Sequence, residues 1–185
     1  MVVIAAALVG YLLGSIPFAL LVGRLAGVAD IRKEGSSNMG TLNVLRVVGL
    51  LPAALTLTLD LGKGLLAAYF GGILAGQPEG ALAGSLGVVL GHILPVFAGF
   101  RGGKSIAVYV GATSLFNFHY LLALGLLWVV TYILLRRVAV TSALTFLMGP
   151  VLMYLYGYSS PFIIYTALAG VAIALRHLPD IKRGR

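Results

Sequence analysis

Residues 138–175 read VAVTSALTFLMGPVLMYLYGYSSPFIIYTALAGVAIAL, a run of 38 residues without an acidic or basic side chain. Near its middle the turn formers Gly157, Ser159, Ser160 and Pro161 interrupt the apolar sequence. A helix needs about 20 largely apolar residues to cross the hydrocarbon core of a bilayer, and Gly, Ser and Pro favour turns. The stretch therefore predicts two antiparallel membrane helices joined by a tight turn.

Four further apolar runs extend this pattern, and they cover residues 1–23, 47–76, 80–100 and 105–135. The last run has a second turn signal at Asn117, and 47–76 carries only Asp60 and Lys63 as charges. We therefore predict an all-α integral membrane protein with seven transmembrane helices, some of them short. Residues 1–185 are expected to form a single membrane-embedded domain.

The composition supports this class of protein. The 185 residues are 60% hydrophobic and 10% charged, with a mean hydropathy of +1.05. A soluble domain is about 25% charged, so an ordinary cytosolic enzyme is excluded, and the absence of Cys excludes a disulfide scaffold. The net charge of +8 does not indicate nucleic-acid binding, because no recognisable binding module accompanies it.

The basic residues predict the orientation of the chain in the membrane. Twelve of the thirteen Lys and Arg residues fall in the segments 24–46, 101–104, 136–137 and 176–185. The alternate turns and the N-terminus carry none, and the thirteenth residue, Lys63, lies inside a span. Basic loops stay in the cytoplasm, so we predict an N-terminus outside and a C-terminus in the cytoplasm.

Three of the basic segments have the composition of anion sites. In 30–46, Gly and Asn allow successive N–H groups to converge, Ser36 and Asn38 add donors, and Arg46 adds a bidentate charge; a solvated helix cap is the alternative. In 99–105, two glycines stand between Arg101 and Lys104, which predicts an anion site. The alternative to an anion site here is an ordinary basic turn. No strand precedes this loop, so a nucleotide P-loop is rejected.

The third basic segment is 176–183, where His177 either binds a phosphate or hydroxyl or is an interfacial residue. Within the spans, Asp60 and Lys63 are three residues apart and predict an internal ion pair. For His92, a hydrogen bond between helices and a role in the site remain equal alternatives. The sequence offers no cluster of metal-ligating residues, and we expect no metal and no organic cofactor.

Six short motifs in order carry a resemblance to a known family, and they are Gly14-Ser15-Ile16-Pro17, Asp30-Ile31-Arg32 with the Gly/Ser/Asn string to Arg46, Asp60-x-x-Lys63-Gly64, Gly91-His92 with Pro95-Val96-Phe97, Phe100-Arg101-Gly102-Gly103-Lys104, and Arg176-His177 with Ile181-Lys182-Arg183. The chain closely resembles the bacterial acyl-phosphate:glycerol-3-phosphate acyltransferases, the PlsY family. The likeness spans nearly the whole chain.

The resemblance implies a multi-pass enzyme of the bacterial cytoplasmic (inner) membrane with its active site on the cytoplasmic face. It implies transfer of a fatty acyl group from long-chain acyl phosphate to the sn-1 hydroxyl of glycerol-3-phosphate, which yields lysophosphatidate and inorganic phosphate. The expected partners are these substrates and membrane lipids, without nucleic acid, and the chain is expected to act as a monomer.

By position, the resemblance implies the catalytic residues Ser36, Arg46, Lys104 and His177. It implies the substrate-binding residues Gly35, Ser37, Asn38, Gly40, Asn43, Arg101, Gly102, Gly103, Ser105 and Asp180. The chain departs from the family at Ser37, where Gly is usual, at Thr41-Leu42, where Ala-Thr is usual, and at Pro179-Asp180, where Glu and Asn are usual. A carboxylate at position 180 would repel a dianionic substrate unless it is protonated or turned away.

Two other classes of protein remain as alternatives. A membrane transporter for a small organic phosphate would also use basic, glycine-rich loops, although such transporters commonly contain internal repeats, which this sequence lacks. A membrane scaffold would not need three cationic loops rich in Gly, Ser and Asn. An assay for lysophosphatidate with acyl phosphate and glycerol-3-phosphate separates the three classes.

Overall fold

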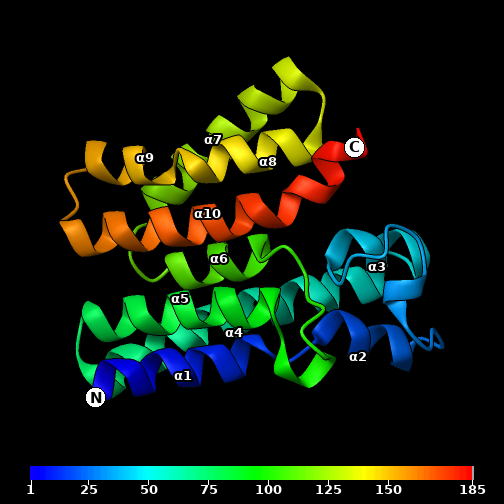
Figure 1. Cartoon of the computed structure of the whole chain (residues 1–185), viewed down its shortest axis with the longest axis horizontal. Helices are drawn as coiled ribbons and strands as arrows, with labels where there is room; N and C mark the ends of the chain where they lie inside the picture. The colour runs from blue at the N-terminus through cyan, green and yellow to red at the C-terminus, as the bar shows by residue number, and fades with distance from the viewer. Residues whose placement is uncertain (185) are drawn as a thin grey trace. The chain divides into compact units, whose positions relative to one another are not determined.

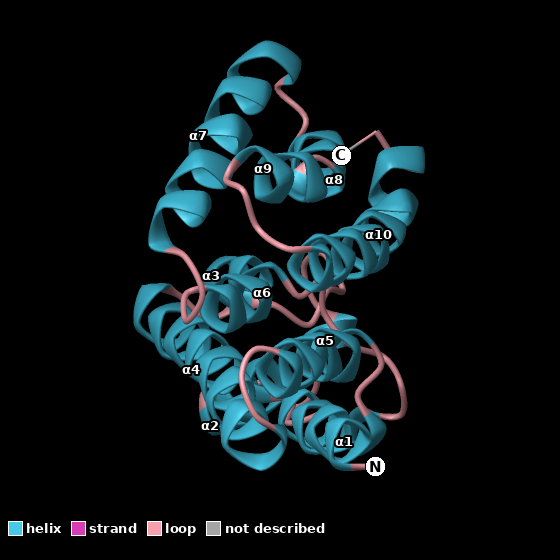
Figure 2. Ribbon diagram, turned by 90° about the vertical axis from the view of Figure 1, so that its left-hand side faces the viewer, coloured by secondary structure: helices cyan, strands magenta, loops and turns pink. Residues whose placement is uncertain are grey.

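The computed structural model describes residues 1–184, which form helices and loops without a strand in that range; Figure 2 shows this all-helical build. The α-helices are α1 (Val2–Gly14), α2 (Phe18–Leu25), α3 (Thr41–Val47), α4 (Leu50–Ala75), α5 (Glu79–Ile93), α6 (Ile106–Thr113), α7 (Phe118–Leu135), α8 (Val138–Leu147), α9 (Gly149–Leu155) and α10 (Ser160–Lys182). Two 3-10 turns, η1 (Ile31–Lys33) and η2 (Val96–Ala98), lie in the loops. The chain divides into two compact units, Met1–Ala112 and the part from Thr113 onward.

The multi-pass membrane character predicted from the sequence is confirmed. Within residues 1–184, six segments are long and apolar enough to cross a bilayer: Val2–Leu25, Leu50–Ala75, Glu79–Ala98, Phe118–Leu135, Val138–Leu155 and Ser160–Lys182. The remaining candidate, α6, has eight residues and rises only about 12 Å, whereas the hydrocarbon core is about 30 Å thick. The seventh crossing and the orientation stay predictions.

The first unit is built around α1, α4 and α5, which lie side by side (Figure 1). Glycines bring their backbones together, because small residues let membrane helices approach closely. A Cβ at Gly84 on α5 would overlap the carbonyl of Ala67 on α4, and one at Gly10 on α1 would overlap the carbonyl of Gly84. This close packing leaves no space for side chains between the three helices at these points.

The chain breaks between α1 and α2, at the motif of residues 14–17. α1 ends at Gly14, and Pro17, which has no N–H to donate, precedes the first residue of α2. The Ser15 hydroxyl donates to the Tyr11 carbonyl at 2.8 Å and accepts the Val96 N–H at 3.3 Å. The break therefore exposes backbone carbonyls of residues 14–16 to a partner from another helix.

In the second unit, α10 packs along α8 and α9, and α7 packs against the same two helices. The indole N–H of Trp128 on α7 donates to the Ser142 hydroxyl on α8 at 3.1 Å. Both predicted turns are confirmed: Asn117 caps α7 by accepting the Tyr120 N–H at 3.1 Å, and the segment between α9 and α10 covers residues 156–159.

Candidate functional site

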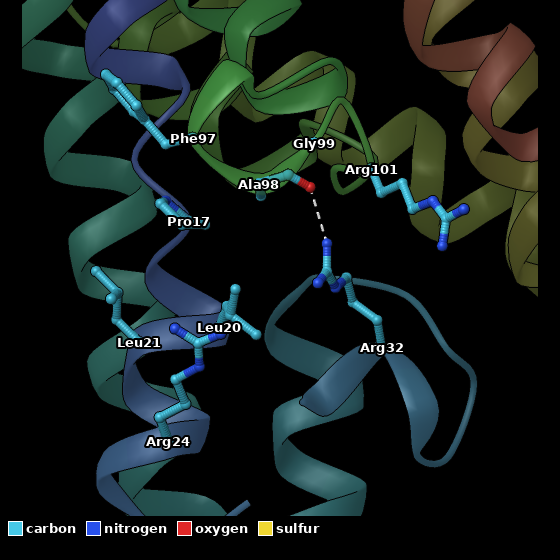
Figure 3. Close-up of a pocket in the computed structure, with 9 residues that line it drawn as sticks. All are labelled: Pro17, Leu20, Leu21, Arg24, Arg32, Phe97, Ala98, Gly99 and Arg101. Atoms are coloured by element: carbon cyan, nitrogen blue, oxygen red, sulfur yellow. Dashed lines mark hydrogen bonds between the residues drawn. The ribbon is translucent and has the colours of Figure 1, made fainter. Parts of the chain in front are cut away.

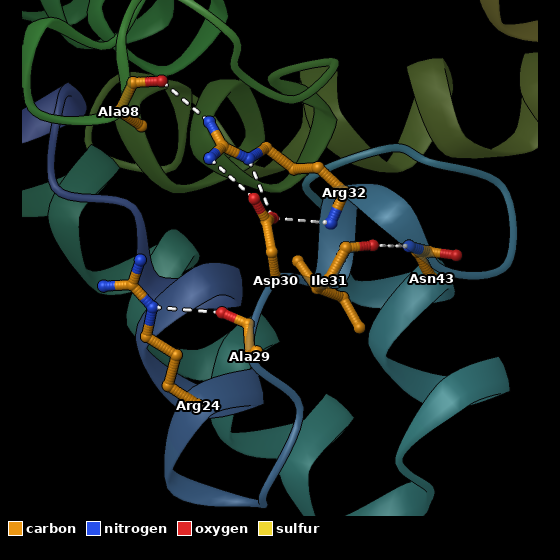
Figure 4. Close-up of polar contacts among 7 residues, drawn as sticks. All are labelled: Arg24, Ala29, Asp30, Ile31, Arg32, Asn43 and Ala98. Carbon is orange, nitrogen blue, oxygen red and sulfur yellow. Dashed lines mark hydrogen bonds and ion pairs between the residues drawn. The ribbon is translucent and has the colours of Figure 1, made fainter.

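An ion pair fastens the start of the polar loop that joins α2 to α3. The Arg32 guanidinium donates to both carboxylate oxygens of Asp30 at 2.9 Å, and its third nitrogen donates to the Ala98 carbonyl at 2.8 Å (Figure 4). These hydrogen bonds from Arg32 lower the pKa of Asp30 to about 2, and the carboxylate raises the pKa of Arg32. Arg32 thus ties η1 to η2, although 66 residues separate the two bonded residues.

Asn43 on α3 organises the middle of the same loop. Its side-chain oxygen accepts the N–H of Ser36 at 2.7 Å and the Ser36 hydroxyl at 3.0 Å, and its amide nitrogen donates to the carbonyls of Ile31 at 2.9 Å and Glu34 at 3.1 Å. The side chain is buried, and these four bonds use its whole hydrogen-bonding capacity. Asn43 therefore holds Ser36 in place and keeps the loop folded.

The backbone of this loop explains one departure from the family pattern. Ser37 has a φ of 60°, in the left-handed region that glycine adopts without a steric penalty. The preceding Gly35 has a φ of 56°. The usual glycine at position 37 therefore matches a conformational requirement, and Ser37 adopts the same conformation at a cost of roughly 1 kcal/mol.

The basic loop that precedes α6 is packed tightly against the end of α5. A Cβ at Gly102 would overlap the carbonyls of His92 and Ile93, and a Cβ at Gly103 would overlap the His92 ring and the Met39 carbonyl. The Gly103 N–H donates to the His92 carbonyl at 3.0 Å. Both glycines are thus required by close backbone contacts, and the Gly103 amide is engaged within the chain.

The same close contact brings the two predicted anion loops together. Met39 belongs to the loop ordered by Asn43, and its carbonyl lies against Gly103, next to Lys104. At the end of the second loop, Ser105 is buried and its hydroxyl donates to the Val89 carbonyl at 2.8 Å. The first unit therefore places the segments of Ser36 and Lys104 side by side, and Ser105 anchors the second of them to α5.

A buried cluster of charges lies beneath the second loop. The Lys63 ammonium on α4 is 2.9 Å from Asp60 Oδ1 and 2.9 Å from His92 Nδ1. It also donates to the carbonyls of Gly14 at 3.1 Å and Ile16 at 2.9 Å, in the break after α1. An ammonium has three N–H donors and no acceptor, so the four groups around Lys63 share three hydrogens.

This cluster bears on two sequence predictions. The internal ion pair of Asp60 and Lys63 is confirmed. Of the two alternatives for His92, the structure shows the hydrogen bond between helices, and a role in the site stays a prediction. His92 also touches the basic loop, since its carbonyl accepts the Gly103 N–H. The cluster therefore joins α4, α5 and the break after α1 to the loop that carries Lys104.

The remaining predicted residues are placed as follows. Arg46 lies in the last turn of α3 and is exposed, and Asn38 lies beside Gly40, which precedes α3. His177 and Asp180 belong to α10 in the second unit. His177 is buried, and its Nδ1 lies 2.8 Å from the Ile173 carbonyl. A carbonyl only accepts, so Nδ1 carries the proton and Nε2 of the neutral ring is an acceptor.

Sequence reasoning missed two arginines that shape the first unit. Arg24 and Arg32 line a cavity of about 630 Å³ together with Arg101 (Figure 3). Arg32 stands in a motif that carried the family resemblance, yet no role was assigned to it. Arg24 could have been noticed as the single cation in the last turn of a short apolar helix.

The fold and the loops together define a class of protein: a multi-pass membrane protein whose joined polar loops present hydroxyls and cations, the groups that bind phosphorylated ligands. Comparison with known proteins identifies the family within this class. The chain belongs to the glycerol-3-phosphate acyltransferase family, whose model matches residues 4–185. It is therefore an acyltransferase, and the transporter and scaffold interpretations are set aside.

Similar proteins cover nearly the whole chain. The glycerol-3-phosphate acyltransferase of Carboxydothermus hydrogenoformans is 38% identical over 183 residues, which cover 99% of this chain and 93% of the relative. The one of Agrobacterium fabrum is 39% identical over 178 residues, 96% of this chain and 86% of the relative. The crystal structure of PlsY, an integral membrane glycerol 3-phosphate acyltransferase, in its glycerol 3-phosphate form has a TM-score of 0.88 at 31% identity and covers 98% of this chain and 90% of that one. Its lysophosphatidic acid form has a TM-score of 0.86 at 30% identity, with the same coverage.

Proposed function

We propose that this acyltransferase moves a fatty acyl group from acyl phosphate to the sn-1 hydroxyl of glycerol-3-phosphate, with lysophosphatidate and inorganic phosphate as products. Two observations support the acceptor and the product: the family to which the chain belongs, and the two forms in which the similar PlsY was crystallised. The acyl phosphate donor follows from the resemblance of the six sequence motifs.

The reaction chemistry fits a site without a conventional nucleophile–base pair. The sn-1 oxygen attacks the acyl carbonyl carbon, an ester bond forms, and the bond between that carbon and the phosphate oxygen breaks. The leaving phosphate takes the hydroxyl proton, so the donor itself supplies the base. An enzyme for this step works by orienting the two substrates and by stabilising negative charge, and cations and ordered loops suffice for both.

The single observation that carries the proposal is the contact between the two loops in the first unit. Asn43 orders the loop of Ser36, and the Met39 carbonyl of that loop lies against Gly103, next to Lys104. We infer that the loop 36–40 cradles the acyl phosphate through the N–H groups of residues 38–40, because those of Ser36 and Ser37 donate to Asn43 and to the Glu34 carbonyl. Lys104 and Arg46 hold the glycerol phosphate. Asn43 and Ser105 act as positioning residues, because their polar atoms are engaged within the chain.

His177 is proposed to act through its Nε2 atom. Its Nδ1–H is directed to the Ile173 carbonyl, which makes the lone pair of Nε2 an acceptor for a substrate hydroxyl in the neutral ring. Asp180 lies one turn further along α10. A pH–rate profile that is unchanged in His177→Gln would leave His177 a binding role and remove an acid–base role.

The proposed location is the cytoplasmic face of the bacterial inner membrane, within a single catalytic domain. The support is the distribution of charge: four of the twelve loop cations lie between residues 24 and 46 and two lie between 101 and 104, the segments that form the joined loops. Basic segments remain on the cytoplasmic side, where a soluble phosphorylated acceptor is accessible.

The test is a reaction with purified protein in detergent, glycerol-3-phosphate, and either palmitoyl phosphate, palmitoyl-CoA or an acyl carrier protein thioester. We expect lysophosphatidate only from palmitoyl phosphate. Lys104→Ala should lower kcat/KM by roughly 30-fold to several thousand-fold, since a charge pair in a partly dry site contributes about 2–5 kcal/mol. Lys33→Ala removes an exposed lysine from the other loop and should keep wild-type activity. Turnover with a thioester alone, or full activity of Lys104→Ala, contradicts the proposal.

A further inference from the structure

A cavity of about 630 Å³ lies next to the joined loops in the first unit. Its lining comes from α2 and the residue before it, from η1, and from η2 and the loop after it. It includes Arg24, Arg32 and Arg101 and the apolar residues Leu20, Leu21 and Phe97. Three arginines thus share a cavity whose other side chains are apolar. Figure 3 shows the Arg24 guanidinium beside Leu20 and the Arg32 guanidinium bonded to the Ala98 carbonyl.

The three arginines differ in how much of their charge is already compensated. Arg32 is paired with Asp30 through two hydrogen bonds. Among residues 1–184, no carboxylate forms an ion pair with Arg24 or Arg101. Arg24 donates its Nε to the Ala29 carbonyl at 3.3 Å, which fixes the side chain and leaves its two terminal amino groups as further donors. The cavity therefore carries two uncompensated positive charges.

Two apolar residues of the cavity are exposed near the ends of membrane-spanning segments. Leu21 is 41% exposed near the end of Val2–Leu25, and Phe97 is 62% exposed near the end of Glu79–Ala98. Leu21, Arg24 and Leu25 are the exposed residues of α2, and their spacing of three and four residues puts them on one face of the helix. A cation thus stands between apolar side chains at a membrane boundary, where an anionic headgroup meets its acyl chains.

We propose that this cavity is a binding site for an anionic phospholipid of the surrounding leaflet. Arg24 binds the headgroup phosphate, and Leu21 and Phe97 contact the first methylene groups of an acyl chain. Guanidinium groups suit this ligand because they bind phosphate oxygens in a bidentate manner. The surface potential of anionic lipids adds attraction for basic residues at this depth.

A bilayer phospholipid fits the cavity better than a free phosphate ion does. The lining contains no Ser, Thr or Asn, whose side chains commonly donate hydrogen bonds to a small free anion. The lining of the cavity shares only Arg101 with the residues predicted to bind substrates. The site is consequently distinguishable from the acyl-transfer loops by variants that leave those loops intact.

The test is native mass spectrometry of the detergent-purified chain, titrated with phosphatidylglycerol and, in parallel, with phosphatidylcholine of the same acyl chains. We expect one phosphatidylglycerol to bind in preference to phosphatidylcholine. Arg24→Gln should weaken this binding by about fivefold, the equivalent of about 1 kcal/mol for one basic side chain near a lipid surface. Arg136→Gln is the matched control, because Arg136 is an exposed arginine outside the cavity, and its binding should stay at the wild-type level.

Two competition experiments distinguish the sources of the phosphate group. Inorganic phosphate at equal concentration should not displace phosphatidylglycerol. A non-hydrolysable acyl phosphonate should not displace it either. If the phosphonate did share the cavity, it would displace phosphatidylglycerol equally from the wild type and from Lys104→Ala. Equal binding by Arg24→Gln and Arg136→Gln overturns the proposal, as does equal binding of phosphatidylcholine. Displacement by inorganic phosphate or by the phosphonate overturns the proposal too, because the cavity would then be a free-anion or a substrate site.

A second variant keeps the test valid if Arg24→Gln does not fold. Phe97→Ser changes an exposed position of the cavity and should also weaken the binding of phosphatidylglycerol.

Discussion

Two ion pairs in the first unit support the same stretch of chain from different environments. Asp60 and Lys63 are each 3% exposed and lie beneath the loop of Lys104. Asp30 and Arg32 are 19% and 24% exposed, and they fasten the turn that precedes that loop. The closest nitrogen–oxygen distance is 2.9 Å in both pairs, so geometry alone does not distinguish them.

The difference lies in what replaces each interaction when one partner is removed. Water reaches the surface pair and can solvate a lone Asp30 or Arg32, so that pair contributes little to the free energy of unfolding. The buried pair has no such substitute, and Lys63 also satisfies the carbonyls of Gly14 and Ile16. Equal distances therefore correspond to very different energetic contributions, and burial determines which is larger.

The largest decrease in the free energy of unfolding is expected for Lys63→Met. The change leaves Asp60 as an unpaired buried charge and removes the donor from His92 and two carbonyls, which should cost about 3–5 kcal/mol of unfolding free energy. The measurement is equilibrium unfolding in mixed detergent micelles. Lys33→Met, at an exposed position, is the control and should stay within about 0.5 kcal/mol of the wild type. Replacing both Asp60 and Lys63 by Leu and Met should be less damaging than Lys63→Met alone, and a larger loss would argue against a charge-pair explanation.

Gly103→Ala tests whether the loop depends on the cluster beneath it. The added methyl group would collide with the His92 ring and the Met39 carbonyl, at a cost of about 1–3 kcal/mol. A loop displaced by 1 Å should lower the acyltransferase rate by up to about 100-fold. Gly62→Ala on α4 has open space around the new methyl group and should be stabilising by up to about 1 kcal/mol. Similar losses in both variants would show that the loop is not under steric control.

The surface pair should give a smaller effect that depends on pH. Asp30→Asn is expected to lower the unfolding free energy by about 1 kcal/mol or less at pH 7. The pKa of Asp30 is lowered to about 2 in the folded protein from about 3.9 in the unfolded chain, so the contribution is complete above about pH 4 and disappears as the pH falls toward 2. Unfolding of the wild type and Asp30→Asn between pH 2 and 7 should show curves that converge at low pH. A difference that persists unchanged at pH 2 would exclude the ion pair as its cause.

The smallest change in stability is expected at Ser37, which lies in the same loop as the surface pair. Ser37→Gly should raise the unfolding free energy by about 0.5–1 kcal/mol, because glycine adopts a φ of 60° without the steric penalty of a Cβ. Ser37→Ala keeps the penalty and should bring no gain. Equal stability of the two variants would locate the effect in the hydroxyl group instead of in the backbone.

Much of the fold could be predicted because the membrane imposes a local rule. The lengths of apolar runs and the turn residues such as Asn117 and Pro161 locate the helix ends, and the spacing of Asp60 and Lys63 predicts their pairing. The exception is the run 105–135. Its first part forms only the eight residues of α6, because the chain before it is occupied by the packed loop around Gly103.

The site was less accessible to sequence reasoning. The residue types of the loops indicated anion binding, but the packing role of Gly103 depends on His92 and Met39, which approach from distant segments. The sequence could not show that Asn43 holds the loop through four hydrogen bonds, and its predicted contact with substrate stays a prediction. Arg24 and Arg32 each carried a local signal, but the cavity that they share could not be predicted, since its walls come from residues about 70 positions apart.

The amino-acid sequence by itself determined the membrane-spanning helices, their turns and the family, because apolar length, turn chemistry and short motifs are local properties of a chain. Only the tertiary structure decided that Lys63 bonds to the break after α1 and to His92. It also decided that the two loops predicted to bind anions touch and that three arginines line one cavity. The physical reason is that hydrogen bonds and steric contacts act over a few ångströms. Which distant residues come within that range depends on how closely the glycine-lined helices pack.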